Sequence, residues 1–361
     1  MSYLVLARKY RPQNLSDLVG QEHIAELLSQ AITSDKVAHA YLFCGPRGVG
    51  KTSCARILAK SLNCEKGPTL KPCDQCTACL EITKGTSFDV LEIDGASNRG
   101  IDEIRALREN VKFAPNYGLY KIYIVDEVHM LTTEAFNALL KTLEEPPPHV
   151  KFIFATTSVQ KVPSTILSRC QRFDFKRIPL KSTIAHLENI SQKEGLNIDE
   201  EALYAVAKAS DGGLRDALSI LDQMGVIRER QIKADDVYLM LGQVELGLIF
   251  AMVDAIGKKN GLEALTIFEK ILSKGKDIRQ LMKDMTDHFR HLMIIKIGGK
   301  TLSRLVDYAS STKDQLLEQS QLFSLPNILL SIDTIMAAQE MGRLVESDQL
   351  AFEIALAKLT Y

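Results

Sequence analysis

The chain has 361 residues, of which 46% are hydrophobic and 25% charged, and its formal net charge is -1. This length allows two or three domains with substantial cores, and the near-zero charge excludes a generally basic nucleic-acid coat. Any contact with DNA must therefore come from a local surface or from several subunits together. No segment approaches the roughly 18 apolar residues of a membrane span, and no signal-peptide core precedes Arg8. We therefore expect a cytoplasmic protein without a membrane partner.

The first half of the chain alternates between strand and helix patterns. A polar, proline-containing segment at residues 8–20 comes first, and apolar residues at helical spacing follow from Ile24 to Ile32. Strands are predicted at 41–44, 88–93, 122–125 and 151–156, with helices from 51 to about 62, at 101–111 and at 133–145. This alternation predicts an α/β fold: a doubly wound, mostly parallel sheet with a phosphate site at the carboxyl ends of its strands.

Beyond about residue 179 the strand signal disappears, and only helical spacing remains. The end of the strand signal and a break near Gly242 predict three domains: an α/β domain at 1–178, a small helical domain at 179–242, which has a short break at 211–213, and a second helical domain at 243–361. Two apolar stripes mark the last domain: Leu262, Leu265, Phe268 and Leu272, and then Ile328, Ile332, Ile335 and Met336. Such stripes form a core or pack against neighbouring subunits, and periodicity does not separate the two uses.

The run Gly45-Pro46-Arg47-Gly48-Val49-Gly50-Lys51-Thr52 matches the phosphate-loop pattern G-x-x-x-x-G-K-[ST]. An apolar strand precedes it and a helix pattern follows it, so that backbone N–H groups and a helix N-terminus would face an anion. In this reading Lys51 reaches the β- and γ-phosphates, and the Thr52 hydroxyl takes a magnesium coordination position. The alternative is a glycine-rich turn that binds nothing.

A second motif is the apolar strand at 122–125 that ends in the adjacent carboxylates Asp126 and Glu127. Strand alternation sends the two side chains in different directions. Asp126 can hold magnesium, directly or through water, while Glu127 can activate a water against the γ-phosphate. A solvated turn is the alternative, and the phosphate loop upstream favours hydrolysis.

Four cysteines, Cys64, Cys73, Cys76 and Cys79, lie between the two motifs, with successive C-x-x-C steps that share Cys76. Four thiolates can close a tetrahedral zinc site, and a local cluster in a cytoplasmic chain favours metal over disulfides. The residues between them suit a small loop-rich module at 64–79 that a metal organises. A redox dithiol and unliganded cysteines are the alternatives.

Three further polar residues follow in chain order. Thr157 ends the strand after the acidic one, where its hydroxyl could sense the γ-phosphate or orient water. Arg169 follows a short segment and could deliver a positive charge, and Arg215 opens a helix that could contact the nucleotide. Taken alone, each of these residues is more often a structural hydrogen-bonding or ion-pairing residue. The prediction of a functional role therefore depends on the order of the three along the chain.

The sequence resembles the ATP-binding gamma/tau subunits of the bacterial DNA polymerase III clamp loader, which are AAA+ proteins. The resemblance covers essentially the whole chain and is carried by ARKYRPQNLSDLVGQEH at 7–23, by the phosphate loop and the four cysteines, by 124–157, by ILSRC at 166–170 and by GGLRDALS at 212–219. The chain reads TTSVQK where the family often has TTDPQK, and Cys44-Gly45-Pro46 where Ser-Gly-Thr is common. Neither departure removes a catalytic group.

The resemblance implies a RecA-like AAA+ domain with a zinc-binding insert, a helical lid and a helical collar that assembles the ring. It implies ATP, Mg²⁺ and Zn²⁺ as cofactors, with the delta and delta prime subunits, further copies of the chain, the sliding clamp and primer-template DNA as partners. The roles it assigns are Walker A for Lys51 and Thr52, Walker B for Asp126 and Glu127, sensor 1 for Thr157, an arginine finger given to a neighbour for Arg169, sensor 2 for Arg215, and adenine-pocket contacts for Arg11 and Val19. The long form's helicase- and polymerase-binding tail is expected outside these residues.

The expected function is that of an ATPase motor that loads the sliding clamp onto primed DNA during replication. One alternative is a zinc-braced nucleotide-binding scaffold without turnover; another is a different AAA+ DNA motor, which the cysteine insert disfavours. Arg99, Arg105, Arg108 and Lys112 occupy or bracket the predicted helix at 101–111. They either follow a DNA backbone or form a solvated helical face.

Overall fold

The computed structural model describes residues 3–98, 100–227, 230–242, 244–302, 306 and 310–361. The chain forms two compact units, the first made of residues 1–190 and 209–223 and the second of residues 191–208 and 224–361.

The first unit is built on a five-stranded parallel sheet with the order β2-β3-β4-β1-β5. Its strands are β1 (Ala40–Cys44), β2 (Val90–Asp94), β3 (Lys121–Asp126), β4 (Val150–Thr156) and β5 (Gln171–Asp174). Its helices are α1 (Leu6–Lys9), α2 (Glu22–Thr33), α3 (Lys51–Asn63), α4 (Thr77–Lys84), α5 (Ile101–Asn110), α6 (Thr133–Glu144), α7 (Ser164–Leu167), α8 (Leu180–Glu194, which runs on into the second unit) and α10 (Leu214–Met224). Short 3-10 turns lie at η1 (Leu15–Asp17), η2 (Val128–Met130) and η3 (Val159–Lys161).

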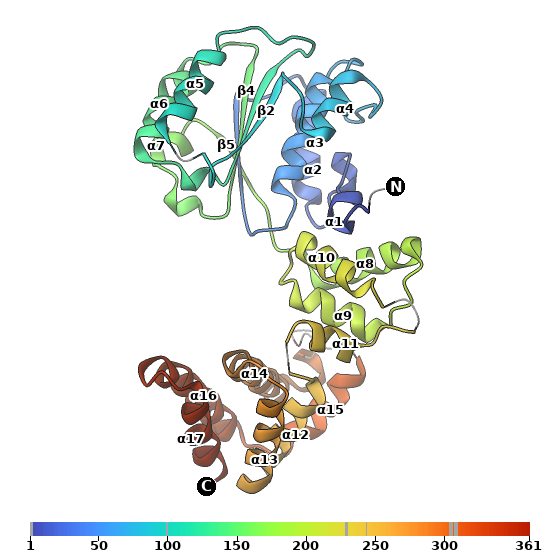
Figure 1. Cartoon of the computed structure of the whole chain (residues 1–361), viewed down its shortest axis with the longest axis vertical. Coiled ribbons are helices and arrows are strands. Elements are labelled where there is room, and N and C mark those ends of the chain that lie inside the picture. The colour runs from blue at the N-terminus through green and yellow to red at the C-terminus, as the bar shows by residue number, and fades with distance from the viewer. Residues whose placement is uncertain (1–2, 99, 228–229, 243, 303–305, 307–309) are drawn as a thin grey trace. The chain divides into compact units, whose positions relative to one another are not determined.

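Helices cover both faces of this sheet, with α2 and α3 on one side and α5 and α6 on the other (Figure 1). Strand alternation produces the two cores: Tyr41 and Phe43 of β1 pack toward α2 and α3, whereas Leu42 packs toward α5 and α6. The predicted three-layer α/β fold is therefore confirmed.

Three of the four predicted strands match closely, while the strand predicted at 88–93 begins two residues later, at Val90. Phe88 is 69% exposed. Strand β5 was not predicted: it is four residues long at the edge of the sheet, and Phe173 is its one buried side chain. A short edge strand with mostly polar residues lacks the apolar run that marks a central strand.

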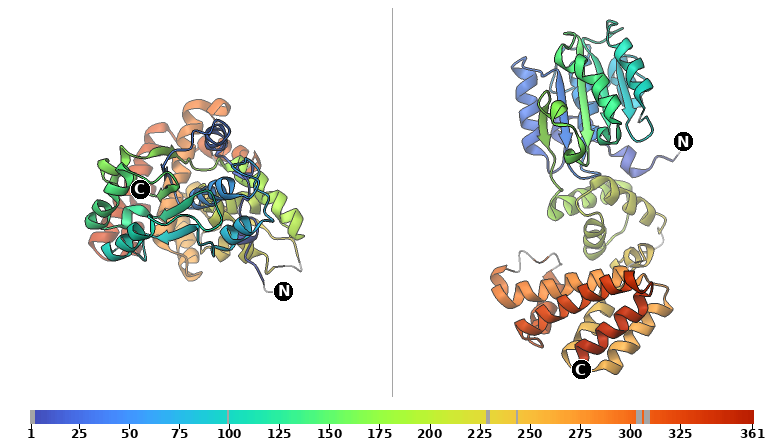
Figure 2. Two further views of the ribbon diagram at one scale, coloured as in Figure 1. Left: turned by 90° about the horizontal axis from the view of Figure 1, so that it is seen from above. Right: turned by 90° about the vertical axis from the view of Figure 1, so that its left-hand side faces the viewer.

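The second unit is helical. Its helices are α9 (Glu200–Ala209, of which residues 200–208 belong to this unit), α11 (Ala234–Met240), α12 (Leu246–Gly257), α13 (Gly261–Ser273), α14 (Ile278–Leu302, with a non-helical backbone at Gly299), α15 (Ser310–Ser320), α16 (Leu325–Leu344) and α17 (Asp348–Thr360). Helices α16 and α17 run beside each other, as the right-hand view of Figure 2 shows, and α14 packs on α16. An isolated parallel bridge between Ile198 and Ile232 is the strand-like pairing described in this unit.

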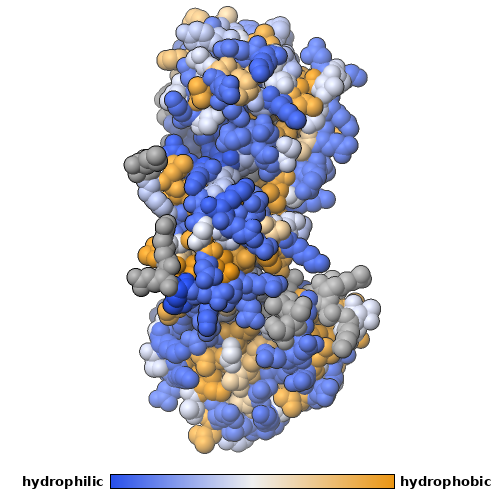
Figure 3. Space-filling view, turned by 90° about the vertical axis from the view of Figure 1, so that its right-hand side faces the viewer, coloured by the Kyte–Doolittle hydropathy of each residue, from blue (hydrophilic) through white to orange (hydrophobic). Residues whose placement is uncertain are grey.

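The two apolar stripes of this unit are only partly core. Phe268, Ile328 and Ile335 are buried, whereas Leu262 is 81% and Met336 51% exposed. Figure 3 shows apolar side chains among polar ones on the visible face of the unit. Part of each stripe is therefore available for contacts outside this unit.

None of the described helices is by itself long and apolar enough to cross a membrane. The segments 312–320 and 325–344 pass a length-and-composition test only as a pair, which is bent by 107°.

Candidate functional site

The phosphate loop joins the carboxyl end of β1 to the N-terminus of α3, as the sequence predicts. Gly50 has a φ of +104°, a backbone conformation that side-chain-bearing residues rarely adopt. A Cβ on Gly45 would lie 2.4 Å from the Phe175 carbonyl oxygen, so a side chain there would displace the backbone after β5. The loop therefore brings bare backbone to the N-terminus of a 13-residue helix, where N–H groups and the helix dipole favour an anion.

Lys51, the first residue of α3, lies at the base of this loop with 6% of its surface exposed. Its Nζ donates hydrogen bonds to the carbonyl oxygens of Gly45, at 2.9 Å, and of Pro46, at 2.7 Å. Burial lowers the pKa of Lys51, while the nearby Glu127 and Asp126 act in the opposite direction. The ammonium group is thus already pointed at the loop that would surround a phosphate.

Thr52 and Asp126 meet between α3 and the end of β3, where the Thr52 Oγ1 donates to the Asp126 Oδ2 at 2.5 Å. The other carboxylate oxygen of Asp126 accepts the Glu127 N–H at 2.9 Å. A hydroxyl and a carboxylate side by side are the hard oxygen donors that Mg²⁺ prefers. The two predicted magnesium ligands are therefore together, and their chemistry fits the ion.

Glu127 follows Asp126 with a φ of +45° and turns toward the end of β4. Its Oε2 accepts hydrogen bonds from the Thr157 hydroxyl, at 3.0 Å, and from the Thr157 N–H, at 3.3 Å. His129 Nδ1 lies 3.2 Å from the same oxygen and 3.0 Å from the Thr156 hydroxyl. Among the described residues, no hydrogen bond reaches the second oxygen, Oε1. Glu127 is thus held through one oxygen, and the other is left for a further contact.

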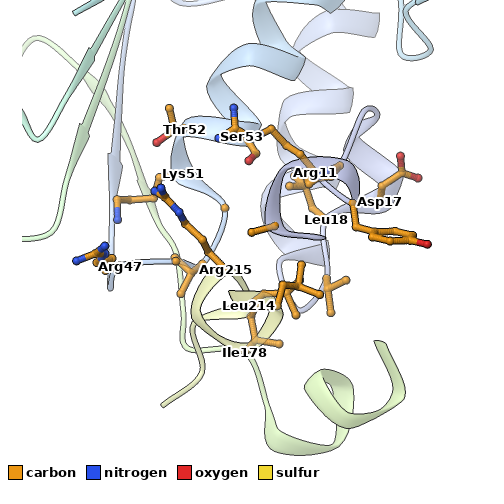
Figure 4. A pocket seen from close by; sticks show the side chains of 18 of the residues that line it. Arg11, Asp17, Leu18, Arg47, Lys51, Thr52, Ser53, Ile178, Leu214 and Arg215 are labelled. Carbon is orange, nitrogen blue, oxygen red and sulfur yellow. The ribbon is translucent and has the colours of Figure 1, made fainter. Parts of the chain in front are cut away.

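These groups open into a cavity of about 460 Å³, which Figure 4 shows from close by. The whole phosphate-loop segment from Arg47 to Thr52 lines it, and so do the predicted pocket residues Arg11, Val19 and Arg215. The Arg215 N–H donates to the Gly48 carbonyl at 3.3 Å, and its side chain extends toward Lys51 (Figure 4). Burial lowers the pKa of Arg11, and the charge of Arg56 adds to this effect.

Several lining residues were not predicted. Some of them are polar: Asp17, Ser53, Glu92, Asp94 and His186. The apolar ones are Pro12, Leu18, Ile178, Leu214 and Leu218, and Figure 4 shows Leu18, Ile178 and Leu214 on the side of the cavity away from Lys51. These apolar residues come from three separate stretches of sequence, so no local pattern marks them as one pocket. An apolar end beside a polar, phosphate-type end is the usual lining of a small-molecule site.

Arg169 does not line this cavity. Its guanidinium donates to the Glu144 carboxylate at 2.6 Å, to the Thr165 carbonyl at 2.7 Å and to the Ser168 hydroxyl at 3.1 Å. The side chain stays about one-third exposed. The structure therefore brings Lys51, Thr52, Asp126, Glu127, Thr157 and Arg215 together and leaves Arg169 at the surface.

The four predicted cysteines form one cluster between α3 and α4, where Cys64 ends α3 and Cys76 caps α4. All four sulfurs lie within 4.8 Å of one another. A tetrahedral zinc with bonds of about 2.3 Å would space its sulfurs about 3.8 Å apart, so this arrangement fits the ion. Backbone N–H groups of Gln75 and Cys76 lower the pKa of Cys73 to about 6, whereas burial raises the pKa of Cys79.

The four basic residues considered for DNA are only partly described. Arg99 lies outside the described residues, and so does the side chain of Arg105. Arg108 and Lys112 are exposed near the end of α5, which agrees with a phosphate-facing surface and with a solvated helical face alike.

The parallel sheet, the phosphate loop after β1 and the acidic pair after β3 define the class of protein as a RecA-like AAA+ nucleotide-binding protein. Three family models match consecutive parts of the chain: DNA polymerase III, delta subunit, at residues 20–179; DNA polymerase III clamp loader subunit, ATPase lid domain, at 183–224; and DNA polymerase III subunits gamma and tau domain III, at 232–361.

Two relatives illustrate the similarity. DNA polymerase III subunit gamma of Buchnera aphidicola is 36% identical, with 99% of each chain covered. DNA polymerase III subunit tau of Bacillus subtilis is 44% identical over 99% of this chain and 63% of its own length. The chain thus belongs to the DNA polymerase III gamma/tau subunit family, and it spans less than two thirds of that Bacillus relative. A solved Bacillus subtilis DNA clamp loader delta protein is 18% identical, with a TM-score of 0.40, and covers 93% of this chain and 99% of its own.

His129 is a further polar residue beside Glu127 that the sequence did not predict. It lies two positions after Glu127, inside a 3-10 turn, and its contact with the carboxylate depends on that turn. A histidine close to a candidate base is a weak signal, and it becomes informative only with the backbone in view.

Proposed function

We propose that the chain is the ATPase motor subunit of a DNA polymerase clamp loader and that it uses ATP to load a sliding clamp onto primed DNA. The observation that carries the proposal is the convergence of Lys51, the Thr52–Asp126 pair and Glu127, which Thr157 holds, on one cavity, in a chain of the gamma/tau family. Lys51 contacts the phosphates, the Thr52–Asp126 pair holds magnesium, and the Glu127–Thr157 pair activates the attacking water.

In this proposal the nucleotide lies along the cavity. Its phosphates take the place of the Gly45 and Pro46 carbonyls as partners of the Lys51 ammonium group, and the loop N–H groups surround them. The base occupies the apolar end near Val19, with Arg11 beside it. Thr52 and Asp126 hold magnesium, which would neutralise charge on the phosphate oxygens.

Glu127 is the general base that activates the attacking water, and Thr157 orients the Glu127 carboxylate. The hydrogen bonds from Thr157 fix Oε2, so that Oε1 is the oxygen that accepts the proton of water. His129 lies on the Oε2 side and supports the same orientation.

Arg169 acts on the nucleotide of a neighbouring copy. Its guanidinium lies outside its own cavity and is bound to Glu144, a surface carboxylate from which a neighbour's phosphate can recruit it. Turnover would then depend on assembly. Arg215, which faces its own loop, senses nucleotide in the same chain.

We further propose the domain division 1–178, 179–242 and 243–361, with the last domain as the assembly collar. Exposed apolar residues in that domain, among them Leu262, Leu344 and Met336, support contacts with other subunits. The proposed partners are delta, delta prime, further copies of this chain, the clamp and primer-template DNA, in the cytoplasm. One structural zinc per chain is bound by Cys64, Cys73, Cys76 and Cys79.

The test is reconstitution with delta, delta prime, the clamp and primed circular DNA. Clamp loading should require ATP and should be lost with Lys51→Ala, whereas Lys66→Ala, at an exposed lysine of the cysteine module, should load normally. Loading without any ATP hydrolysis would instead indicate a nucleotide-binding scaffold, and absence of loading in the complete mixture would contradict the proposal.

A further inference from the structure

Lys60 is a buried cation that the nucleotide site does not use. It lies near the end of α3 with 2% of its surface exposed. Its Nζ donates to the Asp74 carboxylate at 2.6 Å and to the Gln13 side-chain carbonyl at 2.8 Å. A buried ammonium group needs such partners, since removing it from water without them is costly.

Asp74 belongs to the cysteine module, between the cluster members Cys73 and Cys76. Its backbone has a φ of +53°, in the left-handed region that aspartate adopts more often than most residues with side chains. The sulfurs of Cys73 and Cys79 lie 4.0 Å apart beside it. Whatever fixes the cysteines therefore fixes the carboxylate that Lys60 binds.

Gln13 belongs to the N-terminal segment that forms one wall of the nucleotide cavity. Its Nε2 donates to the Arg11 carbonyl at 2.9 Å, and its N–H donates to the Asp17 carboxylate at 3.3 Å. Arg11, Pro12 and Asp17 all line the cavity. Lys60 thus holds the middle of this wall, which we define as residues 11–19, through the Gln13 side chain.

We propose that Lys60 is a positioning residue that couples metal binding at the four cysteines to the wall at 11–19 and, through it, to nucleotide affinity. The proposal rests on the proposed function for the identity of the nucleotide. A metal at the cysteines fixes Asp74, Asp74 fixes the ammonium group, and the ammonium group fixes Gln13. Lys60 lies nine residues after Lys51 on α3, about 13 Å along the helix, so its effect falls on the wall and not on the phosphate contacts.

The experiment compares the full chain with Lys60→Met, which keeps most of the side-chain volume, and with Lys66→Met at an exposed lysine of the same module. Each protein is measured with zinc bound and after zinc is stripped by a chelator. The readouts are the Kd for ATP, the Kd for inorganic triphosphate by competition, and hydrogen exchange of residues 11–19.

With zinc bound, Lys60→Met should weaken ATP binding about threefold to tenfold, the range expected for one or two lost hydrogen bonds, and should leave triphosphate binding unchanged. Stripping zinc should weaken ATP binding and speed exchange at 11–19 in the wild type and in Lys66→Met. It should have little further effect in Lys60→Met. Gln13→Ala should reproduce the ATP effect and provides the same test if Lys60→Met does not fold.

Equal losses for ATP and triphosphate, or an unchanged zinc response in Lys60→Met and Gln13→Ala, would overturn the coupling. Failure of the wild-type chain to bind ATP would instead contradict the proposed function, so the two ideas fail separately.

Discussion

The Thr157 hydroxyl donates a hydrogen bond to the Glu127 Oε2 at 3.0 Å and thereby joins the ends of the neighbouring strands β4 and β3. The Thr157 N–H points to the same oxygen, at 3.3 Å. A side chain that carries out general base catalysis must be held in one orientation, because small displacements of the base lower the rate steeply.

Thr157→Val removes the hydroxyl donor and keeps the shape and the N–H. We expect it to lower the kcat of ATP hydrolysis by about tenfold or more while changing the Kd for ATP little, since Thr157 contacts Glu127 and not the phosphate loop. Thr157→Ser, which keeps a hydroxyl, should retain most of the activity. Steady-state phosphate release measures both variants, and equal activities of Val and Ser variants would exclude the orienting role.

The cysteine cluster should hold about one zinc per chain, bound by four sulfurs with no position left for substrate. Cys76→Ser should lower the zinc content and loosen residues 64–79, because Cys76 both contributes a sulfur and caps α4. Cys54→Ser, at a buried cysteine outside the cluster, is the matched control. Metal analysis measures the zinc content, and limited proteolysis measures how loose residues 64–79 are. A folded wild-type chain free of metal would refute the zinc site.

Asp284 makes the folding stability of the second, helical unit depend on pH. Burial raises the pKa of Asp284 to about 6, above the ordinary value of 3.8. The folded state therefore binds a proton more tightly than the unfolded state, and stability from this group is present below about pH 4 and lost as the pH rises to about 6. Between these pH values the free energy of unfolding falls by about 3 kcal/mol.

Asp284→Asn can still accept the Gln280 hydrogen bond and carries no charge. The free energy of unfolding of this variant should exceed that of the wild type by little at pH 4. The difference should grow up to about pH 6 and stay constant above that value. Chemical denaturation of both proteins at pH 4.5, 6 and 7.5 gives the difference directly. A stabilisation that is equal at all three values would contradict the shift.

Arg169 should matter only in the assembled complex. Arg169→Ala is expected to lower ATP hydrolysis there by about a thousandfold, the lower end of the range for arginine fingers, and to leave the slow turnover of the isolated chain unchanged. Arg172→Ala, at an exposed arginine of β5, is the control. In mixtures of Arg169→Ala and Lys51→Ala chains, activity should return at the mixed interfaces, and its absence would argue against action on a neighbour.

The sequence was sufficient for the elements that depend on local spacing. The phosphate loop, the acidic end of β3 and the four cysteines each place their chemistry within a few residues, so their geometry follows from one strand, one turn or one helix end. Thr157 and Glu127 were both predicted, and parallel strand order then explains why they meet.

The remaining features depend on contacts between distant segments. The apolar end of the cavity combines Leu18, Ile178 and Leu214, and the Lys60 bridge combines segments around Gln13 and Asp74. Strand β5 and the exposed parts of the apolar stripes show the same limit, since periodicity predicts that a face is apolar but not what covers it.

ATP turnover by Glu127→Gln shows whether this carboxylate activates the attacking water. In the assembled loader, we expect this variant to bind ATP within about twofold of the wild type and to hydrolyse it at least about a hundredfold more slowly, because binding uses the loop and Lys51 while water activation uses the carboxylate. Glu134→Gln, at an exposed glutamate of α6, should behave as the wild type. Undiminished phosphate release by Glu127→Gln would exclude Glu127 as the general base.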